Sequence, residues 1–297
     1  MKALKAKKQI LRSQISNARS RNNERQLERE LQRFFDRLGK QVQSNLNDYW
    51  SDHLLQGQID LITKPILEAQ AEYYLILQKY DKREYQLGIR EAERLVRLSK
   101  KPIAEKAIKP RLFKRYDLFA TLRGAEEDLL NNVFIASQAT LARVDTSIKT
   151  LLTEGYQSGK GINYVANLLT RRFDQLTTWE ARRIARTEIH NSHNTAVMDT
   201  YNEIGVEYTM WISAGDDGRT RDSHLGPADG VPDGVDGEII PMGGTYSNGL
   251  KYPGDTDGPI EEWINCRCSN APFVIPYGYM APPFSPFREE DLIQIKK

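Results

Sequence analysis

The segment between residues 216 and 268 constrains the fold of this chain most. It is rich in Gly, Pro and Asp and shows little helical pattern, so its structure must depend on contacts between distant residues rather than on local propensity. Two short segments hold most of its reactive side chains, residues 216–224 (DDGRTRDSH) and residues 262–268 (EWINCRC). They contain one of the chain's four histidines and both of its cysteines. We therefore expect the chemistry of the chain to lie in these two segments.

Cys266 and Cys268 are separated by a single residue. A disulfide between them would close a ring too strained for ordinary disulfide geometry, and so small a loop would hardly constrain the unfolded chain. We expect two reduced thiols, which suits a protein assembled in a reducing cytosol.

His224, Cys266 and Cys268 are candidate ligands for one structural zinc, since thiolates and imidazoles are ligands that zinc prefers. A structural zinc site needs four ligands. The single residue between Cys266 and Cys268 is fewer than the two to four that usually separate a pair of zinc-binding cysteines. The fourth ligand would be a water molecule or one of Asp216, Asp217, Asp222 and Glu262. The alternative is that both cysteines point into a small core from one face of a strand while Arg267 points outward. The sequence leaves both interpretations open.

Lysine and arginine (42) nearly balance aspartate and glutamate (40), but the charges are unevenly placed. Residues 1–22 contain seven basic side chains and no acidic one, whereas residues 216–262 contain eleven acidic side chains against three basic ones. This asymmetry indicates two different partners, or one polyanion that touches the basic end. The candidate DNA-binding residues are Lys2, Lys5, Lys7, Lys8, Arg12, Arg19 and Arg21. The alternative is a solvated helix face or a disordered tail.

The first hundred residues show a helical, strongly charged pattern. Apolar side chains recur at helical spacing and predict a stripe buried against a neighbouring helix; they are Leu27, Leu31, Phe34, Phe35 and Leu38. We expect a further helix to start near residue 64, with Pro65 in its first turn, and residues 73–77 to be buried in it. Pro102 and Pro110 then interrupt the pattern, which predicts a linker over residues 100–115.

Three further helical pieces follow the predicted linker. They cover residues 125–152, 162–173 and 177–204, with a glycine-bearing turn over residues 155–161. The third piece should begin with Thr178 as its cap and end at Gly205, and it carries too many small and polar residues for an ordinary core helix. Within it, His190 and His193 share one helix face, which suits either a metal site or a polar surface.

Short extended runs replace the helical pattern after Gly205 and predict strands over residues 206–212, 238–241 and 266–274. The fold class is therefore α+β. We expect four parts: a charged helical region over 1–110, a helical part over 111–205, a small sheet with long loops over 206–276, and a tail over 277–297.

No segment approaches the eighteen or more apolar residues of a membrane span, and the basic start is not followed by the apolar core of a signal peptide. We expect a soluble protein made in the cytoplasm.

Several short motifs follow one another along the chain: residues 184–188, residues 191–196, Trp211, residues 217–221 with His224, Gly230, residues 253–255 and residues 265–268. In this order they resemble the phage Mu F-like family of head morphogenesis proteins. The resemblance covers about residues 125–275 and is specific as an ordered set, although each short piece alone is weak. Its structural-motif residues are Arg186, Thr187, Glu188, Asp217, Arg219, Thr220, His224, Asn265, Cys266, Arg267 and Cys268.

The resemblance implies a minor head protein that is packaged in few copies inside the procapsid and acts in head morphogenesis or in genome packaging and delivery. It implies the portal protein, a major capsid or scaffolding protein, and double-stranded DNA as partners. The expected location is the host cytoplasm during assembly, and then the capsid interior or portal vertex of the virion.

The chain departs from a common form of the family. Many relatives carry Cys-x-x-Cys in the segment equivalent to 216–224 and His-Pro before the Asn-Cys-Arg-Cys piece, whereas this chain has only His224 and the residues Trp263, Ile264 and Asn265. The motif is then alternatively a hydrogen-bonded clasp, in which Arg219 or Arg221 binds a carboxylate. The carboxylates considered are Asp216, Asp255 and Glu262.

Two other function classes stay open. One is a DNA-binding packaging or ejection factor without a structural role. The other is a nuclease or transferase that uses His224 as acid or base, Arg219 and Arg221 to hold an anion, and Glu188 nearby. The sequence shows no full metal set, phosphate-cradling glycine loop or ordered nucleophile and base, so it favours a non-enzymatic role and we assign no catalytic residue.

Overall fold

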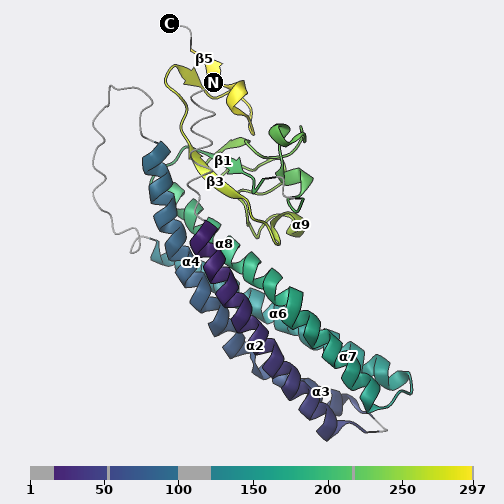
Figure 1. Cartoon of the computed structure of the whole chain (residues 1–297). Coiled ribbons are helices and arrows are strands. Elements are labelled where there is room, and N and C mark those ends of the chain that lie inside the picture. The colour runs from purple at the N-terminus through teal and green to yellow at the C-terminus, as the bar shows by residue number, and fades with distance from the viewer. Residues whose placement is uncertain (1–16, 52–53, 100–121, 216–217, 296–297) are drawn as a thin grey trace. The chain divides into compact units, whose positions relative to one another are not determined.

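The computed structural model describes residues 17–51, 54–99, 122–215 and 218–295 (Figure 1). Asp216, Asp217 and the predicted linker at 100–115 lie outside the described residues. So do the candidate DNA-binding residues Lys2, Lys5, Lys7, Lys8 and Arg12, and the side chain of Arg19. The fold is α+β as predicted, with the long helices before residue 204 and the small antiparallel sheets after it.

The chain divides into two compact units. We call residues 22–81 and 128–186 the helical unit, and residues 1–21, 82–127 and 187–297 the sheet unit. None of the helices in the described part of the chain is long and apolar enough to cross a membrane.

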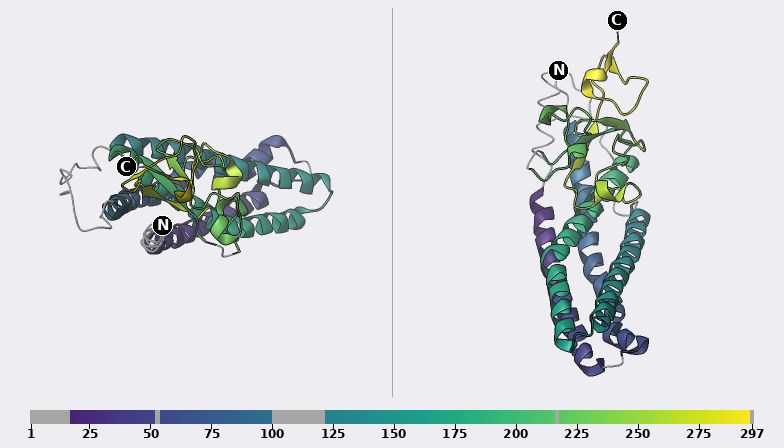
Figure 2. Two further views of the ribbon diagram at one scale, coloured as in Figure 1. Left: turned by 90° about the horizontal axis from the view of Figure 1, so that it is seen from above. Right: turned by 90° about the vertical axis from the view of Figure 1, so that its right-hand side faces the viewer.

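The helical unit is built from parts of α2 (Asn17–Tyr49), α4 (Gln70–Ser99) and α6 (Arg123–Gln157), together with α3 (Gln56–Glu68) and α7 (Ile162–Gln175). Figure 2 gives two further views of these helices, whose close packing is shown by contacts such as that of Gly39 in α2 with the ring of Phe173 in α7. The predicted stripe on α2 is confirmed, since Leu27, Leu31, Phe34, Phe35 and Leu38 are all buried. Tyr73 of α4 packs on Phe34 and Phe35, with ring centroids 5.2 and 6.0 Å apart.

The prediction that Pro65 starts a helix is wrong, because α3 begins at Gln56 and Pro65 lies near its end. A proline inside a helix leaves the carbonyl oxygen four residues earlier without its backbone donor. Here that oxygen belongs to Leu61, and the side-chain amide of Asn45 donates to it at 2.9 Å. A residue of another helix therefore replaces the missing hydrogen bond.

Thr178 is not a helix cap, contrary to the prediction. α7 continues through a π-helical turn, η1 (Leu176–Glu180), into α8 (Ala181–Glu203), and the hydroxyl of Thr178 donates to the carbonyl oxygen of Asp174 at 2.6 Å. Gly155 likewise lies inside α6 and not in the predicted turn. The end of α8 is as predicted, since Gly205 follows it with a left-handed φ of 69°.

The sheet unit contains a three-stranded antiparallel sheet in the order β2-β1-β3, formed by β1 (Tyr208–Ile212), β2 (Ile239–Pro241) and β3 (Ser269–Phe273). The three predicted strands are confirmed in place, but Cys266 and Cys268 precede β3 instead of belonging to it. Ser269 pairs with Ile212, the last residue of β1, so the two cysteines lie beyond the end of this pairing.

Two hydrophobic clusters of the sheet unit contain residues of this sheet. One joins Leu95 of α4 with Met210, Ile212, Ile239, Ala271, Phe273 and Phe287. The other contains both cysteines and comprises Trp211, Val235, Ile240, Tyr246, Leu250, Cys266 and Cys268. Alternation along β1 therefore places Trp211 in the cluster that includes the cysteines. The predicted tail contains a small second sheet, formed by β4 (Tyr279–Met280) and β5 (Ile293–Gln294).

Candidate metal centre

His224 ends a short 3₁₀ helix, η2 (Asp222–His224), in the loop that follows β1, as the sequence predicted. The two cysteines lie between α9 (Ile260–Trp263) and β3. Trp211 of β1 packs edge-on against the His224 ring, with centroids 5.2 Å apart. The strand thus supplies an apolar wall for the imidazole, whereas the loops supply the polar atoms.

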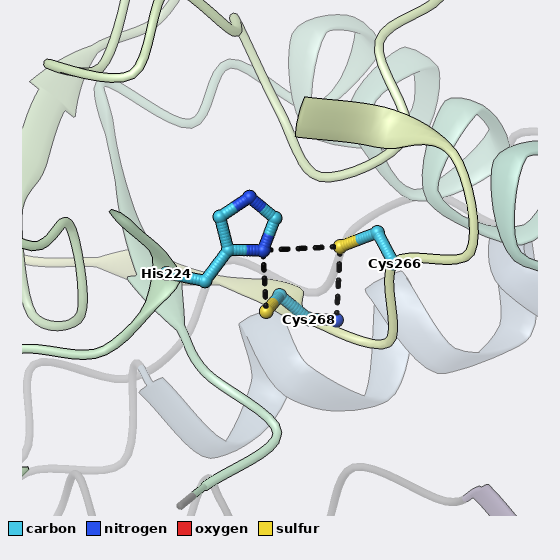
Figure 3. Close-up of side chains that lie close together, drawn as sticks. All are labelled: His224, Cys266 and Cys268. Atoms are coloured by element: carbon cyan, nitrogen blue, oxygen red, sulfur yellow. Dashed lines mark hydrogen bonds between the residues drawn. The ribbon is translucent and has the colours of Figure 1, made fainter. Parts of the chain in front are cut away.

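The structure brings together the three residues predicted as metal ligands, as Figure 3 shows. The Nδ1 atom of His224 lies 3.6 Å from the Sγ atom of Cys266 and 3.5 Å from that of Cys268. All three side chains are buried, both thiols are free, and the three candidate ligand atoms lie within 4.8 Å of one another. We call these residues the His–Cys group. It could hold a metal ion.

The distances match the bond lengths of zinc. With Zn–S bonds of about 2.3 Å and a Zn–N bond of about 2.0–2.1 Å, a sulfur and a nitrogen on a tetrahedral ion lie roughly 3.5–3.6 Å apart. The two measured Nδ1–Sγ separations fall in this range. The donor types, the spacing and the burial of the His–Cys group therefore all fit a zinc ion.

Glu262 lies at the other ring nitrogen of His224. Its Oε2 atom is 2.8 Å from Nε2, and the hydroxyl of Ser223 donates to both carboxylate oxygens at 2.9 and 3.2 Å. Glu262 is thus a hydrogen-bond partner of the imidazole rather than the fourth ligand that the sequence allowed. Asp222, another candidate, is exposed and is not part of the His–Cys group.

Three side chains hold the backbone around the cysteines. Arg221 donates to the carbonyl oxygen of Ile264 at 2.6 Å, and the hydroxyl of Thr187 accepts a hydrogen bond from the N–H of Asn265 at 3.1 Å. Asn194 donates to the carbonyl oxygen of Cys268 at 3.2 Å. These hydrogen bonds provide partners for backbone N–H and C=O groups that lie outside the regular strands and helices.

The arginine clasp of the sequence analysis stays a prediction, because Asp216 lies outside the described residues. Among the described residues, the guanidinium of Arg221 binds a backbone carbonyl oxygen instead of a carboxylate. Arg219 is exposed, and Thr220 donates to the carbonyl oxygen of Gly215 at 2.6 Å. Arg186 belongs to the helical unit, where it pairs with Glu24 at 3.0 Å. These motif residues therefore take part in several local contacts.

The two thiols differ in their electrostatics. Burial alone would raise the pKa of Cys266, but hydrogen bonds from the thiol and backbone N–H of Cys268, together with the charge of Arg221, hold that pKa below its usual value. Burial raises the pKa of Cys268 well above its usual value, and the neighbouring Cys266 raises it further. The Sγ atom of Cys266 accepts the N–H of Cys268 at 3.3 Å.

His193 does not lie on a polar surface, contrary to one of the two interpretations offered for it. It is buried, with Nδ1 at 2.9 Å from Glu84 and Nε2 at 3.6 Å from Glu91, both on α4. Burial alone would lower its pKa, but the hydrogen bonds and charges of the two glutamates raise it to about 10. His190 instead contacts Asn194 at 2.8 Å. The sequence analysis did not identify Glu84 and Glu91 as partners of His193. The one signal for them is their separation of seven residues, which places both on the same face of a helix.

The described contacts do not place the candidate catalytic residues His224, Glu188 and Arg219 in one common site. Both ring nitrogens of the buried His224 are engaged, one by the thiols and one by Glu262. Burial raises the pKa of Glu188 on α8 to about 7. No hydrogen bond is described between the carboxyl group of Glu188 and His224.

One family model matches the chain, over residues 146–271, and it is described as "Phage Mu protein F like protein". None of the curated proteins and none of the solved structures searched matches. The matched segment contains Thr187, Asn194, Arg221 and the whole His–Cys group. Over residues 146–271 the chain is therefore similar to the Phage Mu F-like family.

Proposed function

We propose that this protein is a minor head protein that acts inside the procapsid, in association with the portal and DNA. The observation that carries the proposal is the family match over residues 146–271. Both units expose large apolar side chains that are available to a protein partner. Those of the helical unit include Leu55, Leu61, Leu67, Leu75, Phe134 and Ile135.

Co-expression with the portal protein of the same phage tests this role. We expect the full chain to co-purify with assembled portal, and the complex to persist at moderate salt because apolar contacts are not screened by ions. The major capsid protein, co-expressed in the same way, shows whether the contact is selective. Absence of any complex with portal across a range of salt concentrations would contradict the proposal.

DNA contact through the basic N-terminal residues is the second part of the proposal. It is supported by seven basic side chains without an acidic one in residues 1–22. Replacing Lys2, Lys5, Lys7, Lys8, Arg12, Arg19 and Arg21 by glutamine should weaken binding to double-stranded DNA. The slope of log K against log salt should shrink by about 0.9 for each phosphate that the variant no longer neutralises.

Fluorescence anisotropy with a labelled duplex measures this effect. The matched control is the double variant Lys40→Gln, Lys64→Gln, which removes two exposed lysines of the helical unit and should leave the slope unchanged. An affinity of the wild-type protein that does not respond to salt would refute an electrostatic DNA contact.

We also propose that the His–Cys group holds one structural zinc. The sulfur–nitrogen separations of 3.5 and 3.6 Å carry this part of the proposal. A bound zinc would link residues that are 42 and 44 positions apart in the chain. Only the folded chain holds the three ligands together, so zinc would bind the folded state in preference to the unfolded state and stabilise it.

Elemental analysis of the purified full chain tests the zinc. We expect about one zinc per chain, and none in the variant with both Cys266→Ser and Cys268→Ser. Removing zinc with a chelator should lower the free energy of unfolding by about 2.7–4.1 kcal/mol when free zinc had exceeded Kd by 100- to 1,000-fold. The chelator should not affect the variant. Zinc absent from both proteins would leave the cysteines as core residues only.

A further inference from the structure

The imidazole of His224 has different surroundings at its two nitrogens. Nδ1 faces the two sulfur atoms at 3.5 and 3.6 Å, while Nε2 lies 2.8 Å from the carboxylate of Glu262. A neutral imidazole carries one proton, on one of its two nitrogens. A carboxylate can only accept hydrogen bonds, so the proton belongs on Nε2. Nδ1 is then left with its lone pair directed towards the thiols.

Glu262 is itself held in place. The hydroxyl of Ser223 donates to both of its oxygens, and Ser223 directly precedes His224 in the chain. The Glu262 side chain is 18% exposed, so water competes only weakly for the carboxylate. Glu262 lies on α9, four residues before Cys266, so one short segment carries both sulfur atoms and the carboxylate. The imidazole is therefore held at both nitrogens by residues of the segment 262–268.

We propose that Glu262 is the positioning residue of the metal centre: it keeps the proton of His224 on Nε2 and aims Nδ1 at the metal ion. Metal-binding histidines generally donate their second N–H to a carboxylate or carbonyl group, which orients the ring and strengthens the ligand. The inference rests on the zinc proposed above. It adds that Glu262 acts through His224 and is not itself a ligand.

Zinc affinity, measured by competition with a chromophoric chelator on the full chain, tests this role. Glu262→Ala should weaken zinc binding by about 10–100-fold and still bind one zinc at saturation, since all three ligands remain. Glu262→Gln retains an oxygen that can accept the Nε2 hydrogen bond, so its loss should be smaller. The matched control is Glu261→Ala, which removes the exposed neighbouring carboxylate on α9 and should bind zinc as the wild type does.

Cobalt substitution distinguishes a positioning residue from a ligand. The cobalt spectra of the wild type and of Glu262→Ala should coincide, because the same two sulfurs and one nitrogen bind the ion. A changed spectrum in Glu262→Ala, with the control Glu261→Ala unchanged, would show that Glu262 binds the metal and would overturn the inference. Equal zinc affinities of Glu262→Ala and the wild type would overturn it as well.

The position of the proton on the His224 ring provides a further test, because a Glu262 that only stabilised the fold would not determine which ring nitrogen is protonated. In the zinc-loaded wild type, nitrogen NMR of labelled histidine should show His224 protonated at Nε2 and bound through Nδ1. Binding through Nε2 would refute the inference. A wild-type protein that binds neither zinc nor cobalt would instead refute the proposed zinc site, so the two failures are distinguishable.

Discussion

At the scale of single residues, some buried charged side chains in the described part of the chain lie in groups whose charges compensate one another. His193 is the clearest case, since Glu84 and Glu91 lie on either side of its ring. Arg94 lies 3.8 Å from Glu91 and the hydroxyl of Ser20 donates to Glu84, so each glutamate has a second partner. A buried charge is tolerated only when such partners replace its water.

The raised pKa of His193 predicts a pH dependence of stability. The folded pKa is about 10 and the ordinary value is 6.5, so the stabilisation is fully present below about pH 6.5 and is lost as the pH rises towards 10. Urea unfolding of the full chain across this window should show a decline of about 1–3 kcal/mol that His193→Gln lacks. Comparing the two proteins at each pH cancels the contributions that the other titrating groups make to the free energy of unfolding. A wild-type decline that the variant shares in full would contradict this assignment.

At the scale of elements, the contacts of α8 explain why its sequence differs from that of an ordinary core helix. One set of its side chains, including Thr187 and Asn194, binds the backbone around the cysteines. Another set faces α4, where Gly88 approaches the carbonyl oxygen of His193 and the methyl group of Ala196. Small and polar residues are required on both faces, because one face meets backbone groups and the other a closely packed helix.

The close approach of α4 and α8 predicts a strong effect of Gly88→Ala. A Cβ atom at this position would lie 2.5 Å from the carbonyl oxygen of His193 and 2.7 Å from the Cβ atom of Ala196. Backbone must therefore move, and we expect the free energy of unfolding to fall by about 1–3 kcal/mol. Chemical denaturation monitored by circular dichroism measures this loss.

Gly124→Ala is the matched control for Gly88→Ala. Gly124 lies in α6, is exposed, and an added Cβ atom would meet nothing within 4 Å. Alanine is the better helix former, so this variant should be unchanged or more stable by up to about 1 kcal/mol. Equal stability losses in both variants would show that packing between α4 and α8 is not the cause.

At the scale of the whole molecule, the family segment contributes to both compact units. Residues 146–186 belong to the helical unit and residues 187–271 to the sheet unit, which contains the His–Cys group. The remaining residues of the helical unit, 22–81 and 128–145, lie outside the family match. The two units thus differ in content: the sheet unit contains the whole His–Cys group, and the helical unit contains only the first part of the family match.

Much of the secondary structure follows from the sequence alone. The apolar stripe on α2, the end of α8 at Gly205 and the three strands were predicted, because periodicity and glycine conformation are local properties. The cysteines and the one histidine near them also marked the site, since few other residue types bind zinc. Helix starts were predicted less well, because Pro65 and Thr178 have partners that local rules do not anticipate.

The sequence by itself thus determined the fold class, the places of the three strands of the first sheet and the identity of the His–Cys group. Only the tertiary structure decided that Glu262 lies at the ring of His224, and that His193 lies between two glutamates. The physical reason is distance along the chain. Glu84 and His193 are 109 residues apart, and Glu262 and His224 are 38 apart, so their pairing depends on how the helices and loops pack and not on local propensity.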